Sequence, residues 1–300
     1  MFHQESYNRH SEWYNQHFPG RAEKIDYYRQ KKNVGKSTVA AWLQQLFFDC
    51  VNPLLSSCES WLTVGDAYGF DAEYIISKGA RAVATDLNGD FLAVAKQQGI
   101  IRDYAAENAE RLSFAGGQFD YVLCKESYHH FPRPYAAMYE MIRVARKGVV
   151  IIEPQDPVSK MPALLFITNM LASSASLLNK AWKNRFSYEP VGNFIYKVSE
   201  REFEKFAAGL NLPMVAFKRI NPNFYSVKTE AMLASARDTR FLWIKIKKGI
   251  LDLLVKLKVL PGQVLATIVF KEAPDTDTLD KLMIEGYKVV QIPRNPYLIQ

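Results

Sequence analysis

The fold is decided by one short stretch, Trp61-Leu62-Thr63-Val64-Gly65-Asp66-Ala67-Tyr68-Gly69. Its apolar first half predicts a buried strand, the glycines predict a tight turn, and a helix is expected to begin near Asp71. Glycine at such a turn lets the backbone approach a ligand closely. The stretch therefore predicts the first strand–turn–helix unit of an α/β domain, with a ligand held at the turn.

A carboxylate follows at the end of the next predicted strand. Asp86 stands seventeen residues after Gly69 and closes the apolar run 82–85. A strand-end carboxylate at this distance can bind the two hydroxyls of a ribose. The G-x-G-x-x-G pattern that cradles a diphosphate is absent, because Ala67 separates two glycines and no third follows at the expected spacing. The pattern suits a nucleoside without phosphates better than NAD.

Three further segments follow in the order that such a domain requires. They are a loop at 108–114, a predicted strand at 118–124 followed by the polar segment 125–132, and a predicted strand at 147–154. Strands that alternate with helices over short connections predict a parallel sheet, in which ligands collect at the carboxyl ends of the strands. All the motifs above fall at those ends.

Together these segments resemble the cofactor half of class I S-adenosylmethionine-dependent methyltransferases, whose Rossmann-like sheet is parallel with an antiparallel last strand. The resemblance implies S-adenosyl-L-methionine as the cofactor, with Asp86 on the ribose and the loop at Asn108 against the adenine. Asparagine replaces the family's usual aspartate there, but its side-chain oxygen can still accept a hydrogen bond from the adenine amino group. The implied cofactor-binding residues are Gly65, Asp66, Ala67, Gly69, Asp86, Leu87, Asn108, Ala109 and Lys125.

One position departs from that family. An acidic residue usually stands two positions before the first glycine, whereas this chain has Thr63, and the nearby Asp66 is expected to compensate. The sequence of residues 63–66 and 124–134 also resembles that of a bacterial subgroup of these proteins, one associated with surface-polysaccharide and O-antigen gene clusters. That resemblance implies a small-molecule or carbohydrate acceptor, such as a hydroxyl of a polysaccharide precursor, which could be lipid-linked or anionic.

Two histidines are the candidate catalytic residues. Methyl transfer from a sulfonium is an in-line displacement that needs alignment and exclusion of water, but no covalent residue. A hydroxyl acceptor benefits from a base, and His129 and His130 follow the predicted strand at 118–124. Histidines at this place in the family also pack beside the cofactor without exchanging protons. No metal is expected, although Glu126, Glu153 and Asp156 would form the alternative metal-binding set.

The remaining sequence surrounds this core. The predicted parts are a helical N-terminal cap at 1–60, the S-adenosylmethionine-binding core at 61–154, substrate-recognition helices with the last two strands at 155–275, and a C-terminal tail at 276–300. Strands are predicted at 214–220 and 264–270, the second antiparallel to the first. Ser199 and Glu202 form a capping box that starts a helix. Helices within 161–182 are expected to line a substrate cavity, and the insertion between the two strands is expected to recognise substrate.

Two other segments allow a choice of interpretation. Gly35-Lys36-Ser37-Thr38 imitates the end of a phosphate-binding loop, but the glycine required five positions earlier is Gln30. Residues 241–258 form a basic amphipathic stretch, typical of a helix packed on its own domain and also of one that rests on an anionic membrane surface. The prolines at 293 and 296 favour an extended C-terminal segment docked on the body.

Composition excludes several classes of protein. With 48% hydrophobic and 23% charged residues, the chain is an ordinary globular sequence, not a disordered one. Its net charge of +7 favours an anionic neighbour or reflects a basic solvated surface. Three cysteines without zinc spacing, and a polar start at residues 1–7, predict a cytoplasmic protein, with contact at the inner membrane face left open. The oligomeric state is not predicted.

Two alternatives to a methyltransferase remain open at this point. An NAD(P)-dependent oxidoreductase uses the same sheet, but the missing third glycine and the adenine-loop match disfavour it. A non-catalytic nucleoside-binding module would keep the fold, and Thr63 is the residue that leaves this open. Nucleic acid is a disfavoured partner, because Cys124-Lys125-Glu126-Ser127 stands where base-methylating relatives carry an N-P-P-Y-like tetrapeptide.

Overall fold

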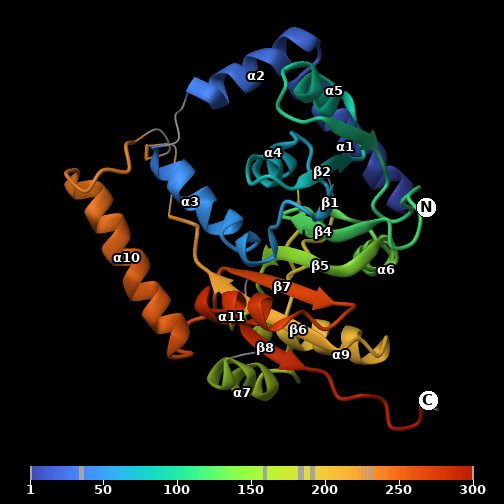
Figure 1. Cartoon of the computed structure of the whole chain (residues 1–300). Helices are drawn as coiled ribbons and strands as arrows, with labels where there is room; N and C mark the ends of the chain where they lie inside the picture. The colour runs from blue at the N-terminus through green and yellow to red at the C-terminus, as the bar shows by residue number, and fades with distance from the viewer. Residues whose placement is uncertain are drawn as a thin grey trace.

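The computed structural model describes residues 2–33, 37–157, 161–181, 186–189, 193–224, 226, 228–229 and 232–298. Its centre is an eight-stranded sheet with the order β3-β2-β1-β4-β5-β7-β6-β8 (Figure 1). Strands β1 to β5 run parallel, β7 is antiparallel to both β5 and β6, and β8 is antiparallel to β6. This confirms the predicted Rossmann-like class I methyltransferase sheet. The strands are β1 Ser60–Val64, β2 Arg81–Asp86, β3 Asp103–Ala106, β4 Phe119–Lys125, β5 Ala145–Pro154, β6 Met214–Ile220, β7 Val264–Phe270 and β8 Lys288–Gln291.

Helices cover both faces of the sheet, so its central strands are apolar on both sides. Successive residues of a strand point to opposite faces, and the neighbours Trp61 and Leu62 accordingly belong to two different apolar clusters. One cluster packs under α4, α5 and α11 and the other under α6 and α9. The helices are α1 Phe2–His17, α2 Arg21–Asn33, α3 Val39–Phe48, α4 Phe70–Ser77, α5 Asp90–Gln97, α6 Pro134–Val144, α7 Pro162–Met170, α8 Ala175–Ala181, α9 Glu200–Gly209, α10 Thr239–Lys256 and α11 Thr276–Ile284.

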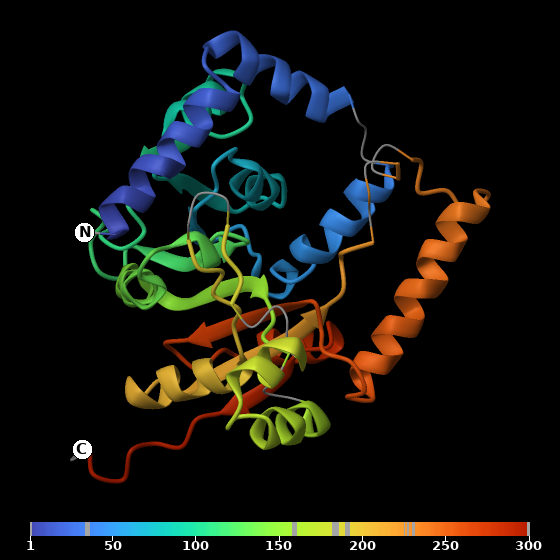
Figure 2. The same ribbon diagram turned by 180° about the vertical axis from the view of Figure 1, so that it is seen from behind.

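The N-terminal helices form an arch around the glycine turn and α4 (Figures 1 and 2). An aromatic cluster holds α1 and α2 in place. The ring of Tyr27 stacks on Tyr68 with 4.8 Å between centroids, and Tyr28 Oη donates hydrogen bonds to the carbonyls of Tyr68 and Phe91 at 2.9 and 3.1 Å. Thr38 caps α3 by accepting from the amide of Ala41 at 3.2 Å, so the part of the imitation phosphate loop that is described simply starts a helix. Gly35 and Lys36 lie outside the described residues.

The C-terminal half confirms several predicted elements and corrects one. Strands β6 and β7 have the predicted bounds, and Ser199 with Glu202 makes the predicted capping box. The predicted C-terminal tail at 276–300 begins with regular structure, because α11 packs Leu282 into the core and β8 adds to the free edge of β6. The prolines at 293 and 296 come after β8, in a segment without helix or strand that bonds to the body through the amides of Ile292 and Asn295. Among the described helices, none has the length and apolar character needed to cross a membrane.

Candidate active site

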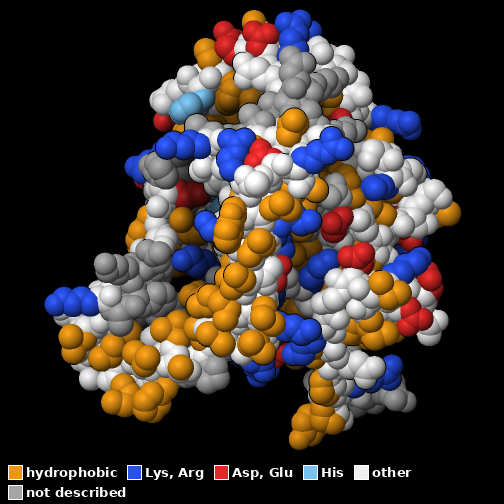
Figure 3. All heavy atoms as spheres, turned by 90° about the vertical axis from the view of Figure 1, so that its left-hand side faces the viewer, with side chains coloured by type: hydrophobic (Ala, Val, Ile, Leu, Met, Phe, Trp, Pro, Cys, Tyr) orange, Lys and Arg blue, Asp and Glu red, His pale blue; other side chains and the backbone are white. Residues whose placement is uncertain are grey.

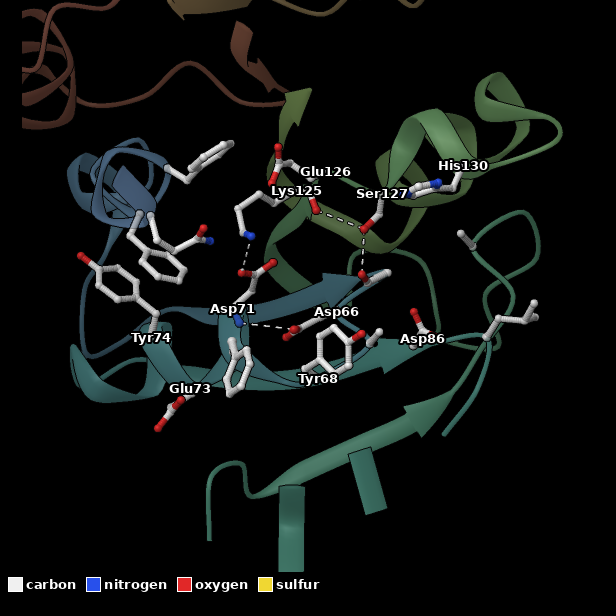
Figure 4. A pocket seen from close by; sticks show the side chains of 18 of the residues that line it. Asp66, Tyr68, Asp71, Glu73, Tyr74, Asp86, Lys125, Glu126, Ser127 and His130 are labelled. Carbon is white, nitrogen blue, oxygen red and sulfur yellow. Dashed lines mark hydrogen bonds and ion pairs between the residues drawn. The ribbon is translucent and has the colours of Figure 1, made fainter. Parts of the chain in front are cut away.

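A cavity of about 1110 Å³ lies at the carboxyl ends of β1, β2 and β4 (Figure 4). Parallel strands bring their ends together there, which is why residues far apart in sequence share it. Its lining includes eight of the nine residues expected to bind cofactor, together with one of the two candidate histidines, His130. The eight are Gly65, Asp66, Ala67, Asp86, Leu87, Asn108, Ala109 and Lys125.

The turn needs glycine because its backbone adopts positive φ angles and passes close to a neighbouring side chain. Gly65 has a φ of +72°, and a Cβ there would collide with the side chain of Ser127 at the end of β4. Ser127 Oγ instead donates to the Gly65 carbonyl at 2.7 Å. Gly69 has a φ of +75° and precedes α4, so its role is to start this helix, and it does not line the cavity.

Asp66 bonds to Thr63, the residue that stands where the family usually has an acid. The Thr63 hydroxyl donates to the Asp66 carboxylate at 2.9 Å, and the same carboxylate accepts from the backbone amides of Asp71 and Ala72 at the start of α4. The threonine and the acid therefore hold the turn together. Burial, and then the nearby Asp71, raise the pKa of Asp66 to about 7.

A buried ion pair forms the cavity wall next to α3. Lys125 Nζ lies 3.1 Å from Asp71 Oδ1, and the two side chains are only 11% and 8% exposed. Burial alone would lower the pKa of Lys125, but the charge and hydrogen bond of Asp71 outweigh it and raise the pKa. The rings of Phe47 and Phe48 on α3 lie 5.6 and 5.7 Å from the ammonium. Lys125 therefore ties the end of β4 to α3 and α4.

Asp86 has the features that a ribose diol needs. Figure 4 shows it with His130 at one end of the cavity, away from Lys125 and Asp71. Its Oδ1 accepts from the amide of Asn88 at 2.9 Å, and no cationic side chain among the described residues forms a salt bridge with it. Burial raises the pKa of Asp86 to about 6. A nearly buried carboxylate that faces a cavity fits a ligand offering two hydroxyl donors.

The two histidines, adjacent in sequence, have different surroundings. His129 Nδ1 bonds to Glu153 at the end of β5, and the other oxygen of Glu153 accepts from the amides of Ser127 and Tyr128 at 2.7 Å each. Burial alone would lower the pKa of His129, but the contact with Glu153 raises it. His129 does not line the cavity. Its contact with Glu153 supports the loop after β4.

His130, in contrast, faces the cavity. Its Nδ1 lies 2.6 Å from Glu189 Oε2, and its side chain is one third exposed. Burial alone would raise the pKa of Glu189, but the hydrogen bond and charge of His130 lower it. Since Nδ1 donates to the carboxylate, Nε2 is left as an acceptor, an assignment of tautomer that follows from the hydrogen bond. The arrangement can take a proton from a hydroxyl.

Sequence reasoning missed the groups that surround His130. Asn193 Nδ2 donates to the His130 carbonyl at 2.7 Å, and Ser6 of α1 donates to Asn193 at 2.6 Å. His10 of α1 also lies against His130, with 6.2 Å between ring centroids, and burial lowers the pKa of His10. No local pattern marks these residues, because their partners lie 63 or more positions away. Helices α7 and α8, expected to line a substrate cavity, contribute no described residue to this one.

One group of side chains could hold a metal ion. Within the described ranges, ligand atoms of His129, His130 and Glu189 lie within 4.8 Å of one another. The alternative set of Glu126, Glu153 and Asp156 is not brought together in this way, because Glu153 is bound to His129 and to backbone amides. The hydrogen bond between His130 and Glu189 accounts for the closeness of the observed group without a metal.

Comparison with known proteins identifies the central part of the chain. Residues 62–152 match the family described as methyltransferase domain. Uncharacterized proteins of Mycobacterium tuberculosis and Mycobacterium bovis are 38% identical over 77 residues, which span 24% of this chain and 28% of theirs. The match thus covers little more than a quarter of these relatives.

The comparison with solved structures found matches at low sequence identity. A SAM-dependent methyltransferase from Archaeoglobus fulgidus is 14% identical with a TM-score of 0.48, covering 82% of this chain and 100% of that one. A Burkholderia thailandensis 1,6-didemethyltoxoflavin-N1-methyltransferase with bound S-adenosylhomocysteine is 13% identical with a TM-score of 0.48, covering 84% and 87%. The family match alone shows that the chain carries a methyltransferase domain, and S-adenosylmethionine is the cofactor of such a domain.

Proposed function

We propose that the whole chain transfers a methyl group from S-adenosylmethionine to a hydroxyl of a small-molecule or carbohydrate acceptor, such as a surface-polysaccharide precursor. One observation carries this proposal. A single cavity is lined both by the strand-end residues suited to a nucleoside, Asp86 and Asn108, and by His130 with its hydrogen-bonded carboxylate. The nucleoside site and the base thus share one space.

Cofactor binding would fall to three elements. Asp86 accepts hydrogen bonds from the ribose hydroxyls, the loop at Asn108 and Ala109 contacts the adenine, and the turn at Gly65 lets backbone approach the remainder. When bound, S-adenosylmethionine supplies a methyl group on a positively charged sulfur. The protein has to align the acceptor oxygen with that methyl carbon and to exclude water. The arch of α1 and α2 over the cavity provides cover.

His130 is the proposed base. Glu189 holds its Nδ1, so Nε2 can accept the proton that the acceptor hydroxyl loses as its oxygen attacks. The negative charge of Glu189 then stabilises the imidazolium that forms. His129 is not assigned this role, because its Nδ1 is bound to Glu153 and it does not line the cavity.

The end of the cavity away from His130 suits a sugar unit of the acceptor other than the one that carries the reacting hydroxyl. Between α3 and α4 it is lined by the stacked rings of Phe48 and Tyr74, 4.2 Å apart, and by Gln44, Gln45 and Glu73. Aromatic faces pack on the C–H faces of pyranose rings, while amides and carboxylates bind sugar hydroxyls. The volume of about 1110 Å³ exceeds the roughly 300–1,000 Å³ of a typical single-ligand pocket, leaving space for an acceptor beside the cofactor.

The test is methyl transfer from S-adenosylmethionine carrying a labelled methyl group, offered with nucleotide sugars, lipid-linked glycans, small phenols and amines. We expect label in a hydroxyl-bearing acceptor, and His130→Gln should lower kcat by about 10²–10⁴-fold with unchanged cofactor affinity. His17→Gln, at the exposed end of α1, is the matched control and should leave kcat unchanged. Labelling of amines alone, or full activity of His130→Gln, would contradict the proposal.

A further inference from the structure

Helix α10 carries an apolar stripe that nothing in the described chain covers. Its members recur every three or four residues and so lie on one side of the helix. They are Trp243, Ile246, Ile250, Leu253 and Leu257, whose exposures are 62%, 49%, 55%, 55% and 61%. Figure 3 looks onto this side and shows hydrophobic side chains running along the helix. We call these five residues the α10 stripe.

The stripe is not the side that attaches α10 to the body. Phe241 and Val255 are buried, and the ring of Phe241 meets Trp42 of α3 with 5.2 Å between centroids. Asp252 accepts hydrogen bonds from Asn221 and Lys248, each at 2.6 Å. These contacts attach the helix to the body without involving the α10 stripe, which therefore faces outward.

Basic residues flank the α10 stripe on both sides. By helical spacing, Lys247 lies beside one edge and Lys256 lies toward the other, and both are exposed. The helix contains one acidic residue, Asp252, which is occupied by the contacts above. The outward surface of α10 is therefore apolar in the middle and positive at its borders.

We propose that α10 docks on the surface of an anionic lipid bilayer, with the α10 stripe inserted among the lipids and the lysines at the headgroups. An exposed apolar stripe with bordering lysines and a tryptophan is the pattern of an interfacial helix. A protein partner fits less well, because lysine is depleted from protein–protein interfaces. The helix does not span the bilayer, consistent with its composition.

A second group of exposed apolar side chains extends this surface. Phe166 and Met170 of α7 are each 66% exposed, and Leu177 of α8 is 51% exposed. In Figure 3 more hydrophobic side chains gather low on the same face, where α7 and α8 lie. Two such regions on one face match a flat partner such as a bilayer. They also give α7 and α8 a role other than lining the cavity.

Docking through α10 would bring the cavity close to the lipids. The segment before α10 pairs with the start of α3, since Val39 N donates to the Met232 carbonyl at 2.8 Å and Ala234 N donates to the Ser37 carbonyl at 2.7 Å. The other side of α3 lines the cavity with Gln44 and Phe48. The sugar of a lipid-linked glycan would therefore have only a short distance to cross from the bilayer to the cavity. This extension rests on the proposed methyltransferase function.

The experiment is co-sedimentation of the full chain with vesicles of phosphatidylcholine, with and without about one third phosphatidylglycerol. We expect binding to the anionic vesicles that weakens as salt rises. Trp243→Ser/Ile246→Ser/Ile250→Ser should lower binding more than about tenfold, and each of Lys247→Gln and Lys256→Gln roughly fivefold at low salt. Tyr139→Ser is the matched control, since Tyr139 is 54% exposed on α6, across the molecule from α10 (Figure 1).

The unfolding midpoint of each variant serves as the check on folding, and it should change little because the replaced side chains are exposed. Unchanged sedimentation of the triple variant, or absence of binding to anionic vesicles, would overturn the proposal. So would a dimer that the triple variant converts to a monomer, because the α10 stripe would then join two copies of the chain. Docking needs no cofactor, so these results are independent of the proposed function. If docking holds and no lipid-linked acceptor is methylated, only the extension fails.

Discussion

The cavity wall and the outer side of α10 depart from an ordinary globular protein in opposite ways. At the cavity, charged side chains are buried, and Asp66, Asp71 and Lys125 lie close together. At α10, apolar side chains are exposed. Most proteins bury apolar groups and expose charges. A buried charge costs stability unless a partner compensates it, and an exposed apolar side chain contributes little to folding, so substitutions in the two regions should have different effects.

The two regions also differ in whether their side chains have bonding partners within the chain. Buried charges at the cavity wall have specific partners, such as the Asp71 carboxylate for Lys125 or the backbone amides of Asp71 and Ala72 for Asp66. The α10 stripe has no such partner among the described residues. Changes at the cavity should therefore have large effects on binding and stability, while changes at the α10 stripe should affect only association.

The largest effect is expected from Asp86→Ala, measured as binding of S-adenosylhomocysteine by calorimetry or thermal shift. Two hydrogen bonds to a carboxylate contribute about 3–6 kcal/mol, so affinity should fall by roughly 10²–10⁴-fold. In the unaltered protein, affinity should also fall as pH drops below about 6, because Asp86 must be ionised and its pKa is about 6. Asp103→Ala, an exposed carboxylate on β3, is the control. Retained affinity in Asp86→Ala would remove this residue as the ribose ligand.

A second large effect is expected from Lys125→Met, measured as the free energy of unfolding in urea. Removing one partner of a buried pair leaves Asp71 uncompensated and should cost about 3–5 kcal/mol. Adding Asp71→Asn should recover much of this loss. Lys96→Met breaks the exposed pair with Asp103, and should change stability by less than about 0.5 kcal/mol. Equal losses for both lysines would mean that the cavity wall is not a distinct electrostatic environment.

How much of this could be predicted from sequence depends on distance along the chain. Gly65 and Asp86 were predictable because strand ends of a parallel sheet meet at one edge. The strands at 214–220 and 264–270 were predictable from their apolar runs. The different roles of His129 and His130 were not, because they depend on Glu153 and Glu189, which lie 24 and 59 positions away. The short turn after β4 sends adjacent side chains to different partners.

The amphipathic pattern of α10 also predicted only part of what the structure shows. The pattern of residues 241–258 predicted a helix, and the structure has one there. It could not tell which apolar residues would be buried, because α10 has apolar residues on more than one side. Contact with α3 buries Phe241, Val255 is buried near the other end of the helix, and the α10 stripe remains exposed. A tertiary contact, not local spacing, decides what remains available to a partner.

An intermediate effect is expected from His129→Gln, measured as unfolding free energy across a range of pH. The bond to the Glu153 carboxylate should contribute about 1.5–3 kcal/mol. The folded protein raises the pKa of His129 above its usual 6.5, so the stabilisation is complete below pH 6.5 and is lost as pH rises through the folded pKa. The difference between the unaltered protein and His129→Gln should therefore shrink with increasing pH. A difference that grew with pH would show that His129 is neutral in the fold.

The smallest effect is expected at the α10 stripe itself, and it makes the comparison quantitative. Ile250→Gln replaces a side chain that is 55% exposed, so the free energy of unfolding should change by less than about 0.5 kcal/mol. Val255→Ala, on the buried side of the same helix, should cost about 1–2 kcal/mol, because methyl groups leave the packed contact. Denaturant titration of the two variants separates the sides of α10. A large loss for Ile250→Gln would mean that the α10 stripe packs against the chain in solution, and the opposition between α10 and the cavity wall would then disappear.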